Sequence, residues 1–66
     1  MFKFDKLFET MKEKNVSTYR LREECILDSK TIRRLKANEN VELKTLDKIC
    51  SFLDCQIQDI VEFVKD

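Results

Sequence analysis

The sequence contains no glycine, no proline and no histidine among its 66 residues, and these absences restrict its chemistry. Without glycine it has no GxxxxGK or GxGxxG loop of the kind that cradles nucleotide phosphates. Without histidine it lacks the usual general base and the commonest metal ligand. A chain this short buries only about 60% of its unfolded surface, so a catalytic cavity beside an adequate core is not expected. We therefore predict a single domain over residues 1–66 that is not an enzyme and uses no cofactor.

Cysteines and long apolar runs are also few. Three cysteines, Cys25, Cys50 and Cys55, are an odd number in a short chain, which favours free thiols over a disulfide framework. Their spacing is loose for zinc, so we expect no metal site. The longest apolar run, residues 25–27, has three residues and cannot span a bilayer, and the first residues lack a signal-peptide core. The expected protein is cytoplasmic, with no membrane partner and no evident small-molecule ligand.

Apolar residues recur at helical spacing instead. A hydrophobic content of 42% with a charged content of 39% fits a folded chain. The apolar residues that predict a first helix are Phe4, Leu7, Phe8 and Met11. Asn15 follows them and is suited to the left-handed conformation that ends a helix.

Four further helix starts share one pattern, in which apolar residues on either side of a capping residue pack together. The four capping positions are Ser17, Asp28, Glu42 and Gln56. Ser17 and Asp28 are the stronger caps because their side-chain oxygens accept unpaired backbone N–H groups. The helix over residues 43–53 should enter the core through one stripe, formed by Leu43, Leu46, Ile49, Cys50 and Leu53.

The two chain ends show a shorter period. Residues 61–65 fit either a helix end or a short strand, and residues 2–4 alternate apolar and charged side chains. We hypothesise that the two ends pair as a small ribbon. The predicted fold is therefore all-α, with five helices and a short ribbon joining the chain ends.

Charge is balanced in total but not in position. Residues 1–38 contain ten Lys/Arg and six Asp/Glu, whereas residues 39–66 contain three and seven. The acidic later part suits a protein-interaction module, such as an antitoxin or anti-repressor, that meets a basic partner. The basic earlier part suits a nucleic acid. Both interpretations stay open on total charge alone.

The basic residues gather on one predicted helix. Residues 29–38 have no acid, and their four cations are Lys30, Arg33, Arg34 and Lys36. Ile32 and Leu35 would face the core, and a rotation of 100° per residue then turns the first three cations to solvent. Such a cationic ridge is either a solvated helix face or a nucleic-acid contact.

The context of the ridge is that of a helix-turn-helix, over about residues 17–37: a capped helix, a turn at residues 25–27 and a second capped helix. In that motif the second helix enters the major groove and the first lies across the backbone. We expect base contacts from Ser29, Lys30 and Arg34, because Ser and Lys bond groove acceptors and Arg pairs bidentately with guanine. The residues expected at phosphates are Ser17, Thr18, Arg20, Thr31, Arg33, Lys36 and Lys44.

Residues 17–41 (STYRLREECILDSKTIRRLKANENV), followed from residue 43 by LxxLxxICxxLDCQIxDIVEF, resemble the short bacterial Cro/cI-type (Xre-like) helix-turn-helix regulators. The resemblance covers nearly the whole chain. It implies a five-helix, lambda-repressor-like domain that binds double-stranded DNA as a transcriptional regulator, with repression as the expected activity. By position it implies the base contacts named above, and phosphate contacts within residues 38–45 that include Asn38, Asn40 and Thr45.

Two positions depart from the pattern of that family. Ile26 stands where a turn glycine is usual, and a β-branched residue resists a positive φ. Either the first helix runs on through a different turn or Ile26 is strained. Asp28 replaces the common Ser cap, and it caps equally well but puts a negative charge near a phosphate.

The last residues are more apolar than a short terminal segment needs to be. The residues expected to form a self-complementary dimer patch are Ile57, Val61, Phe63 and Val64. The alternative is that these side chains cover the first helix. A dimer would present two recognition helices about 34 Å apart to a palindromic site. We expect a homodimer.

Overall fold

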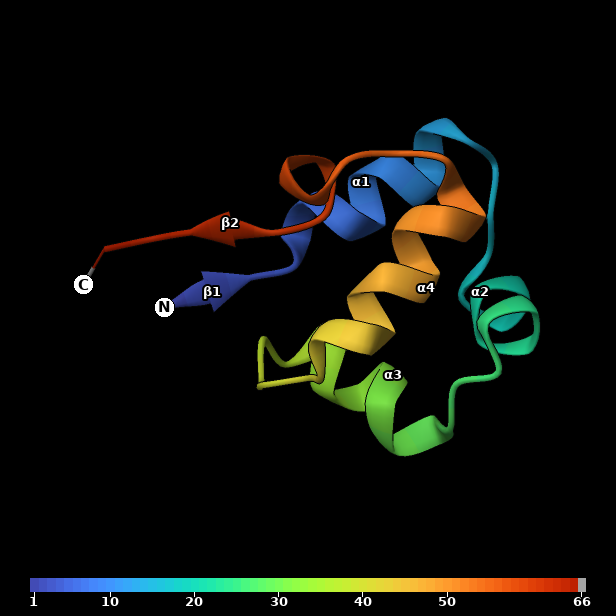
Figure 1. Ribbon diagram of the computed structural model, residues 1–66, viewed down its shortest axis with the longest axis horizontal. Coiled ribbons are helices and arrows are strands. Elements are labelled where there is room, and N and C mark those ends of the chain that lie inside the picture. Colours follow the sequence, from blue (N-terminus) through green and yellow to red (C-terminus); the bar gives the residue numbers. More distant parts are fainter. Residues whose placement is uncertain (66) are drawn as a thin grey trace.

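The computed structural model describes residues 1–65 as four α-helices, one 3-10 turn and a two-stranded ribbon (Figure 1). In chain order the elements are β1 (Phe2–Lys3), α1 (Asp5–Glu13), α2 (Thr18–Cys25), α3 (Ser29–Lys36), α4 (Leu43–Leu53), the 3-10 turn η1 (Ile57–Asp59) and β2 (Glu62–Phe63). Figure 1 shows α4 running through the middle, with the other three helices around it. The helical class is as predicted, but the fifth helix is only a single 3-10 turn.

Capping chemistry sets where the helices begin. The Ser17 hydroxyl accepts the Arg20 N–H at 3.1 Å, and the Asp28 carboxylate accepts the Thr31 N–H at 2.7 Å. Glu42 precedes α4 without a side-chain hydrogen bond, as expected of a weaker cap. Gln56 precedes η1, and its backbone N–H donates to the Asp59 carboxylate at 3.0 Å. All four predicted capping positions are therefore confirmed.

The helices end without glycine. Each of the four is followed by a residue with φ between 52° and 58°, namely Asn15, Ile26, Asn38 and Asp54. The next residue then donates its N–H to the carbonyl five positions earlier, at 2.8–3.1 Å. This is the Schellman arrangement, which satisfies carbonyls that a helix end leaves free. Asn15 ends the first helix as predicted, and Ile26 adopts the strained alternative.

The core takes one fully buried residue from each helix and one from the segment after η1. These residues are Leu7, Leu21, Leu35, Ile49 and Ile60. The predicted stripe of α4 is wrong in one place, because Leu43 is 81% exposed. Leu43 is the first residue of α4, and the helix meets the core only from its second turn.

The chain ends pair as predicted. β1 and β2 are antiparallel, with Phe2 opposite Phe63 and Lys3 opposite Glu62. The rings of Phe2 and Phe63 meet edge to face with centroids 5.4 Å apart. Figure 1 shows this ribbon extending away from the helices, so both rings remain exposed. None of the helices described within residues 1–65 has the length and hydrophobicity of a membrane-spanning segment.

Candidate nucleic-acid interface

The amphipathic character of α3 is as predicted. Ile32 and Leu35 are buried, which fixes the rotation of the helix and leaves Lys30 and Arg33 exposed. Arg34 is only half-exposed, because it lies at the rim of an apolar groove beside the ribbon. Two of the three cations predicted on the ridge, Lys30 and Arg33, are therefore exposed, and the third, Arg34, is only partly exposed.

Between residues 1 and 65, no ion pair neutralises the positive charge of α3. Of the salt bridges found within residues 1–65, none involves a cation of α3. One carboxylate lies near, at the N-cap Asp28. Hydrogen bonds from the Thr31 hydroxyl and N–H, with help from Arg34 and Lys30, hold the pKa of Asp28 below its ordinary value. Asp28 is thus an ionised cap at neutral pH, and the rest of the face is cationic.

Thr31 contributes to the cap at Asp28 through its backbone, because its N–H donates to the carboxylate at 2.7 Å. Ser29, at the first position of α3, is exposed, as is Lys30. The Thr31 backbone therefore has a capping role, and the phosphate contact expected of its hydroxyl stays a prediction.

The start of α2 lies beside α3. The first-turn N–H groups of Thr18 and Tyr19 have no intrahelical carbonyl to bond, as at any helix start. The Ser17 hydroxyl accepts a hydrogen bond but can still donate its own proton. Backbone N–H groups and hydroxyls at a helix start suit a phosphate oxygen.

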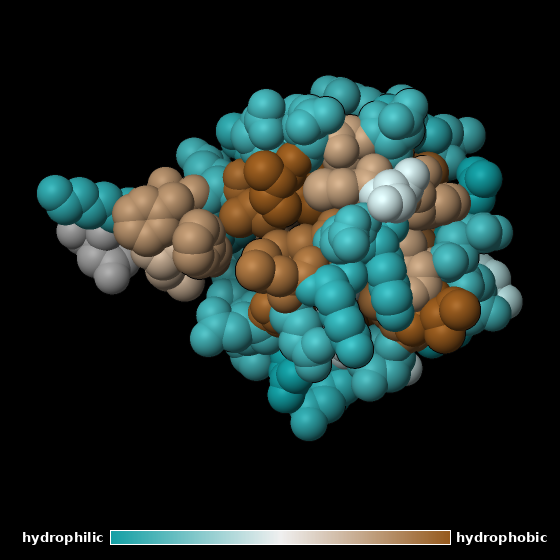
Figure 2. Space-filling model, viewed as in Figure 1, coloured by the Kyte–Doolittle hydropathy of each residue, from teal (hydrophilic) through white to brown (hydrophobic). Residues whose placement is uncertain are grey.

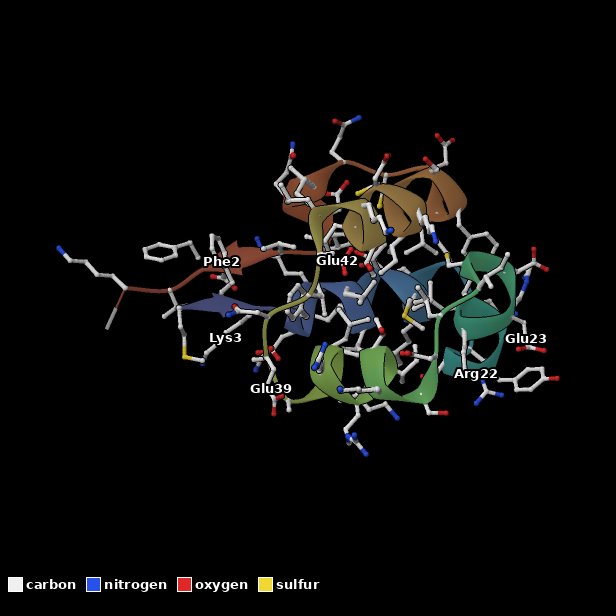
Figure 3. The ribbon with its side chains drawn as sticks, turned by 60° about the horizontal axis from the view of Figure 1, so that its bottom comes forward. Phe2, Lys3, Arg22, Glu23, Glu39 and Glu42 are labelled. Carbon is white, nitrogen blue, oxygen red and sulfur yellow. The ribbon has the colours of Figure 1, made fainter. Side chains whose placement is uncertain are left out.

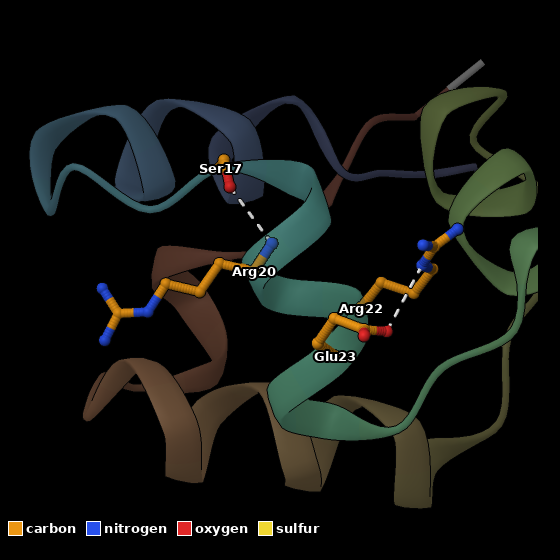
Figure 4. A network of polar contacts seen from close by, with 4 residues as sticks. All are labelled: Ser17, Arg20, Arg22 and Glu23. Atoms are coloured by element: carbon orange, nitrogen blue, oxygen red, sulfur yellow. Dashed lines mark hydrogen bonds and ion pairs between the residues drawn. The ribbon is translucent and has the colours of Figure 1, made fainter.

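The two arginines of α2 leave the helix on opposite sides (Figure 4). Arg20, one of the predicted phosphate contacts, lies with its guanidinium carbon 5.6 Å from the centre of the Phe52 ring on α4. Arg22, which is not among the predicted contacts, lies on the side of α3. Its position could have been found from the sequence, because it shares a helix face with Thr18 four residues earlier.

Arg22 borders a shallow hollow of about 290 Å³ between α2 and α3. We call this the interhelical hollow, and its lining residues are Thr18, Tyr19, Arg22, Ser29, Ile32 and Lys36. It brings together three of the predicted contact residues, one from α2 and two from α3. Tyr19 also lines the hollow, although it is not among the predicted contacts. It is exposed, and its ring centre lies 5.4 Å from the guanidinium carbon of Arg22.

The predicted contact residues within residues 38–45 differ from one another in exposure and in hydrogen-bond or ion-pair partners. The side-chain oxygen of Asn38 accepts the Phe4 N–H at 2.7 Å, which ties the end of α3 to the start of α1. Asn40 is exposed and Thr45 is half-buried. Lys44 is exposed, and its Nζ lies 3.8 Å from the Glu42 Oε2 atom. This segment therefore carries one structural residue and a cation that is partly neutralised.

A second hollow is an apolar groove where the ribbon meets α3 and α4 (Figure 2). Five of the seven exposed large hydrophobic residues found within residues 1–65 line it: Met1, Phe2, Leu43, Ile57 and Phe63. Of the predicted dimer patch, Val61 also lines the groove, and Val64 is half-buried in the ribbon end. Figure 3 shows Phe2 and Lys3 at the end of the molecule opposite Arg22 and Glu23. The apolar groove and the interhelical hollow are thus separate surfaces.

The three cysteines are free thiols. Cys25 is buried and contacts the Lys48 carbonyl at 3.7 Å, and burial raises the pKa of its thiol. Burial also raises the pKa of Cys55, with the neighbouring Cys50 adding to the effect. Within residues 1–65, no three potential ligand side chains converge on a place for a metal ion.

Two short capped helices joined by a tight turn, the second with an exposed cationic face, define a helix-turn-helix DNA-binding fold. The sequence profile of the Cro/C1-type HTH DNA-binding domain matches residues 6–66, and the chain belongs to this family. The crystal structure of the transcriptional regulator VanUg, form II, is similar to it with a TM-score of 0.93 and 31% sequence identity. That similarity covers 98% of this chain and 87% of the VanUg chain. No curated protein sequence matches the chain.

Proposed function

We propose that this protein is a sequence-specific transcriptional regulator that inserts α3 into the major groove and acts as a repressor. The observation that carries the proposal is the outward face of α3, where Lys30 and Arg33 are exposed and form no ion pair within the described chain. Cations on a solvent face provide both attraction to phosphates and hydrogen bonds to base edges. Repression follows most simply, because a bound protein covers the DNA that another protein would need.

The first turn of α3 is best suited to the bases. Ser29 and Lys30 are exposed there, and each can donate to an acceptor in the major groove. Arg34 lies one turn later, and its guanidinium can pair with O6 and N7 of a guanine. Arg34 is half-buried, which restricts the directions that its guanidinium can take. Arg33 is exposed on the same helix and can bind a phosphate.

The apolar groove supports a homodimer. Monomeric proteins rarely expose such a continuous apolar surface, and Ile57, Phe63 and Phe2 all contribute to this one. A two-fold axis beside the ribbon would bury it against the same surface of a second copy. The two α3 helices would then contact half-sites about 34 Å apart.

Selection of bound duplexes from a random pool tests the proposal. The expected result is a palindrome with one helical turn between half-site centres. Log K for the selected duplex should fall linearly with log salt, with about 0.9 of slope for each neutralised phosphate. Recovery of no preferred sequence, with binding that does not respond to salt, would contradict the proposal.

A second candidate function has its own observation in favour. Residues 39–66 hold seven acids against three bases, and the apolar groove is rimmed in part by Glu39. A basic protein partner could meet this side, as with an antitoxin or anti-repressor of the same fold. The same salt titration separates the two functions, because only duplex binding gives the phosphate-dependent slope.

A further inference from the structure

The interhelical hollow brings two cations from different helices to one place. Arg22 comes from α2 and Lys36 from the last turn of α3, and both line the hollow. The hydroxyl residue Thr18, at the start of α2, lines it too. The donor groups of Arg22, Lys36 and Thr18 match a phosphodiester, which has one negative charge and two free oxygens that accept several hydrogen bonds.

Arg22 is held in position by its neighbours. Its guanidinium carbon lies 5.4 Å from the centre of the Tyr19 ring, and its Nε lies 3.8 Å from a Glu23 carboxylate oxygen. Figure 4 shows this pair on the side of α2 away from Arg20. Because Glu23 meets the Nε edge, the two terminal nitrogens remain to form the fork that guanidinium groups present to phosphates.

Arg20 serves as the internal comparison. It has the same charge, lies two residues away on the same helix, and its guanidinium lies over Phe52 of α4, at 5.6 Å from the ring centre. That contact joins α2 to α4 on the side away from the interhelical hollow. The two arginines therefore have different contacts, although both are arginines of the same short helix.

We propose that the interhelical hollow is a phosphate site in which Arg22 and Lys36 bind one DNA phosphate, with Tyr19 and Glu23 as positioning residues for Arg22. This inference rests on the proposed DNA-binding function and names a contact within it. Arg20 binds no phosphate and acts only on stability.

The test pairs protein variants with single uncharged phosphates. Each phosphate of the selected duplex is replaced in turn by a methylphosphonate, and affinities are measured for the wild type, Arg22→Ala, Lys36→Ala and Arg20→Ala. On the natural duplex, Arg22→Ala should weaken binding about tenfold, as expected for a lost charge-assisted bond. At one methylphosphonate position the wild type should bind at least as weakly as Arg22→Ala binds the natural duplex, because the contacts of both cations are lost there, and neither Arg22→Ala nor Lys36→Ala should weaken binding further.

The positioning role has a separate readout. Tyr19→Ser should weaken binding to the natural duplex in the wild-type background and have no effect in the Arg22→Ala background. Arg20→Ala should lower the melting temperature and leave the affinity of the folded protein and its salt slope unchanged. Circular dichroism shows that each variant is folded at the temperature of the binding measurement.

The outcomes distinguish this inference from the proposed function. Salt-dependent duplex binding in which Arg22→Ala couples to no phosphate, or in which Arg20→Ala is equally harmful, would overturn the phosphate site alone. Coupling of Arg22 and Lys36 to two different phosphates would also overturn it. A wild-type protein that binds no duplex would overturn the proposed function, and the site with it.

Discussion

Ile26 adopts φ 53° and ψ 54°, a left-handed conformation that side chains branched at Cβ resist. The residue is 85% exposed, so packing of its side chain does not compensate for this strain. The other three left-handed positions at helix ends carry Asn or Asp, which tolerate the conformation better. The strain is therefore a local property of one residue in the turn between α2 and α3.

We predict that Ile26→Asn raises the free energy of unfolding by about 1 kcal/mol, because the left-handed backbone becomes easier to hold. Urea unfolding measures the change. Ile26→Ser is the matched control, since it makes the same 85% exposed position polar with a residue that does not favour the left-handed conformation. An equal gain in both variants would show that surface polarity, and not backbone strain, is responsible.

Asp28 gives stability a defined pH dependence. Its pKa is lowered in the folded protein, first by the Thr31 hydroxyl and then by the Thr31 N–H. A lowered pKa means that the ionised cap stabilises the fold above the ordinary carboxyl pKa of about 3.9. This contribution is lost as the pH falls from about 3.9 through the lower pKa of Asp28 in the folded protein.

We predict that wild type is more stable than Asp28→Asn at pH 7 and that the difference disappears in strong acid. Urea unfolding at both pH values checks this, and a difference that persisted in acid would contradict the assignment.

The sequence predicts individual residues well where their task is local. The capping role of Ser17 and Asp28 depends on groups within three residues, and both were identified. Asn15 was likewise identified as a helix end. The contact between Arg20 and the Phe52 ring could not be predicted in this way, because Phe52 lies far along the chain and only the packing of α2 on α4 brings the two together.

At the scale of the elements, helix starts could be predicted better than helix lengths. The pattern around Gln56 correctly gives a start, but η1 has only three residues. The chain must bury Ile60 and then turn outward so that β2 reaches β1. Pairing between the two ends of the chain thus overrides the local helical pattern, and local spacing cannot show where this happens.

Asn38 joins two elements through a single side chain. Its backbone has φ 58° at the end of α3, and its side-chain oxygen accepts the Phe4 N–H at 2.7 Å before α1. We predict that Asn38→Gly lowers the free energy of unfolding by about 1 kcal/mol through loss of the hydrogen bond. Asn38→Ala should cost about 2 kcal/mol, because the left-handed backbone is strained as well.

Chemical denaturation of the two variants side by side checks this assignment. Equal losses for Gly and Ala would show that the backbone conformation contributes little. No loss for either would show that the bond to Phe4 does not hold α3 against α1.

At the scale of the molecule, the polar and apolar surfaces lie at different places. The cations of α3 and the interhelical hollow form one surface, and the apolar groove beside the ribbon forms another. Helical period predicts the exposed cations because it needs only the buried Ile32 and Leu35. The apolar groove depends on how the paired ends sit against Leu43, and that placement is beyond any local pattern.

We predict that Phe63→Ser converts the proposed dimer to a monomer at concentrations where the wild type is dimeric, because a large apolar contact is lost. Tyr19→Ser is the matched control. The two rings are similarly exposed, at 63% and 66%, but Tyr19 lies beside the interhelical hollow and not in the apolar groove. Analytical ultracentrifugation of the three proteins measures the effect. A wild type that sediments as a monomer with and without duplex would contradict the dimer.

The most direct measurement is to titrate the isotopically labelled protein with its selected duplex and follow every backbone amide by NMR. The largest shifts should fall in α3 and the first turn of α2, around Ser29, Lys30 and Thr18. Shifts centred instead on the ribbon and the apolar groove, with α3 unchanged, would contradict the placement of α3 in the major groove.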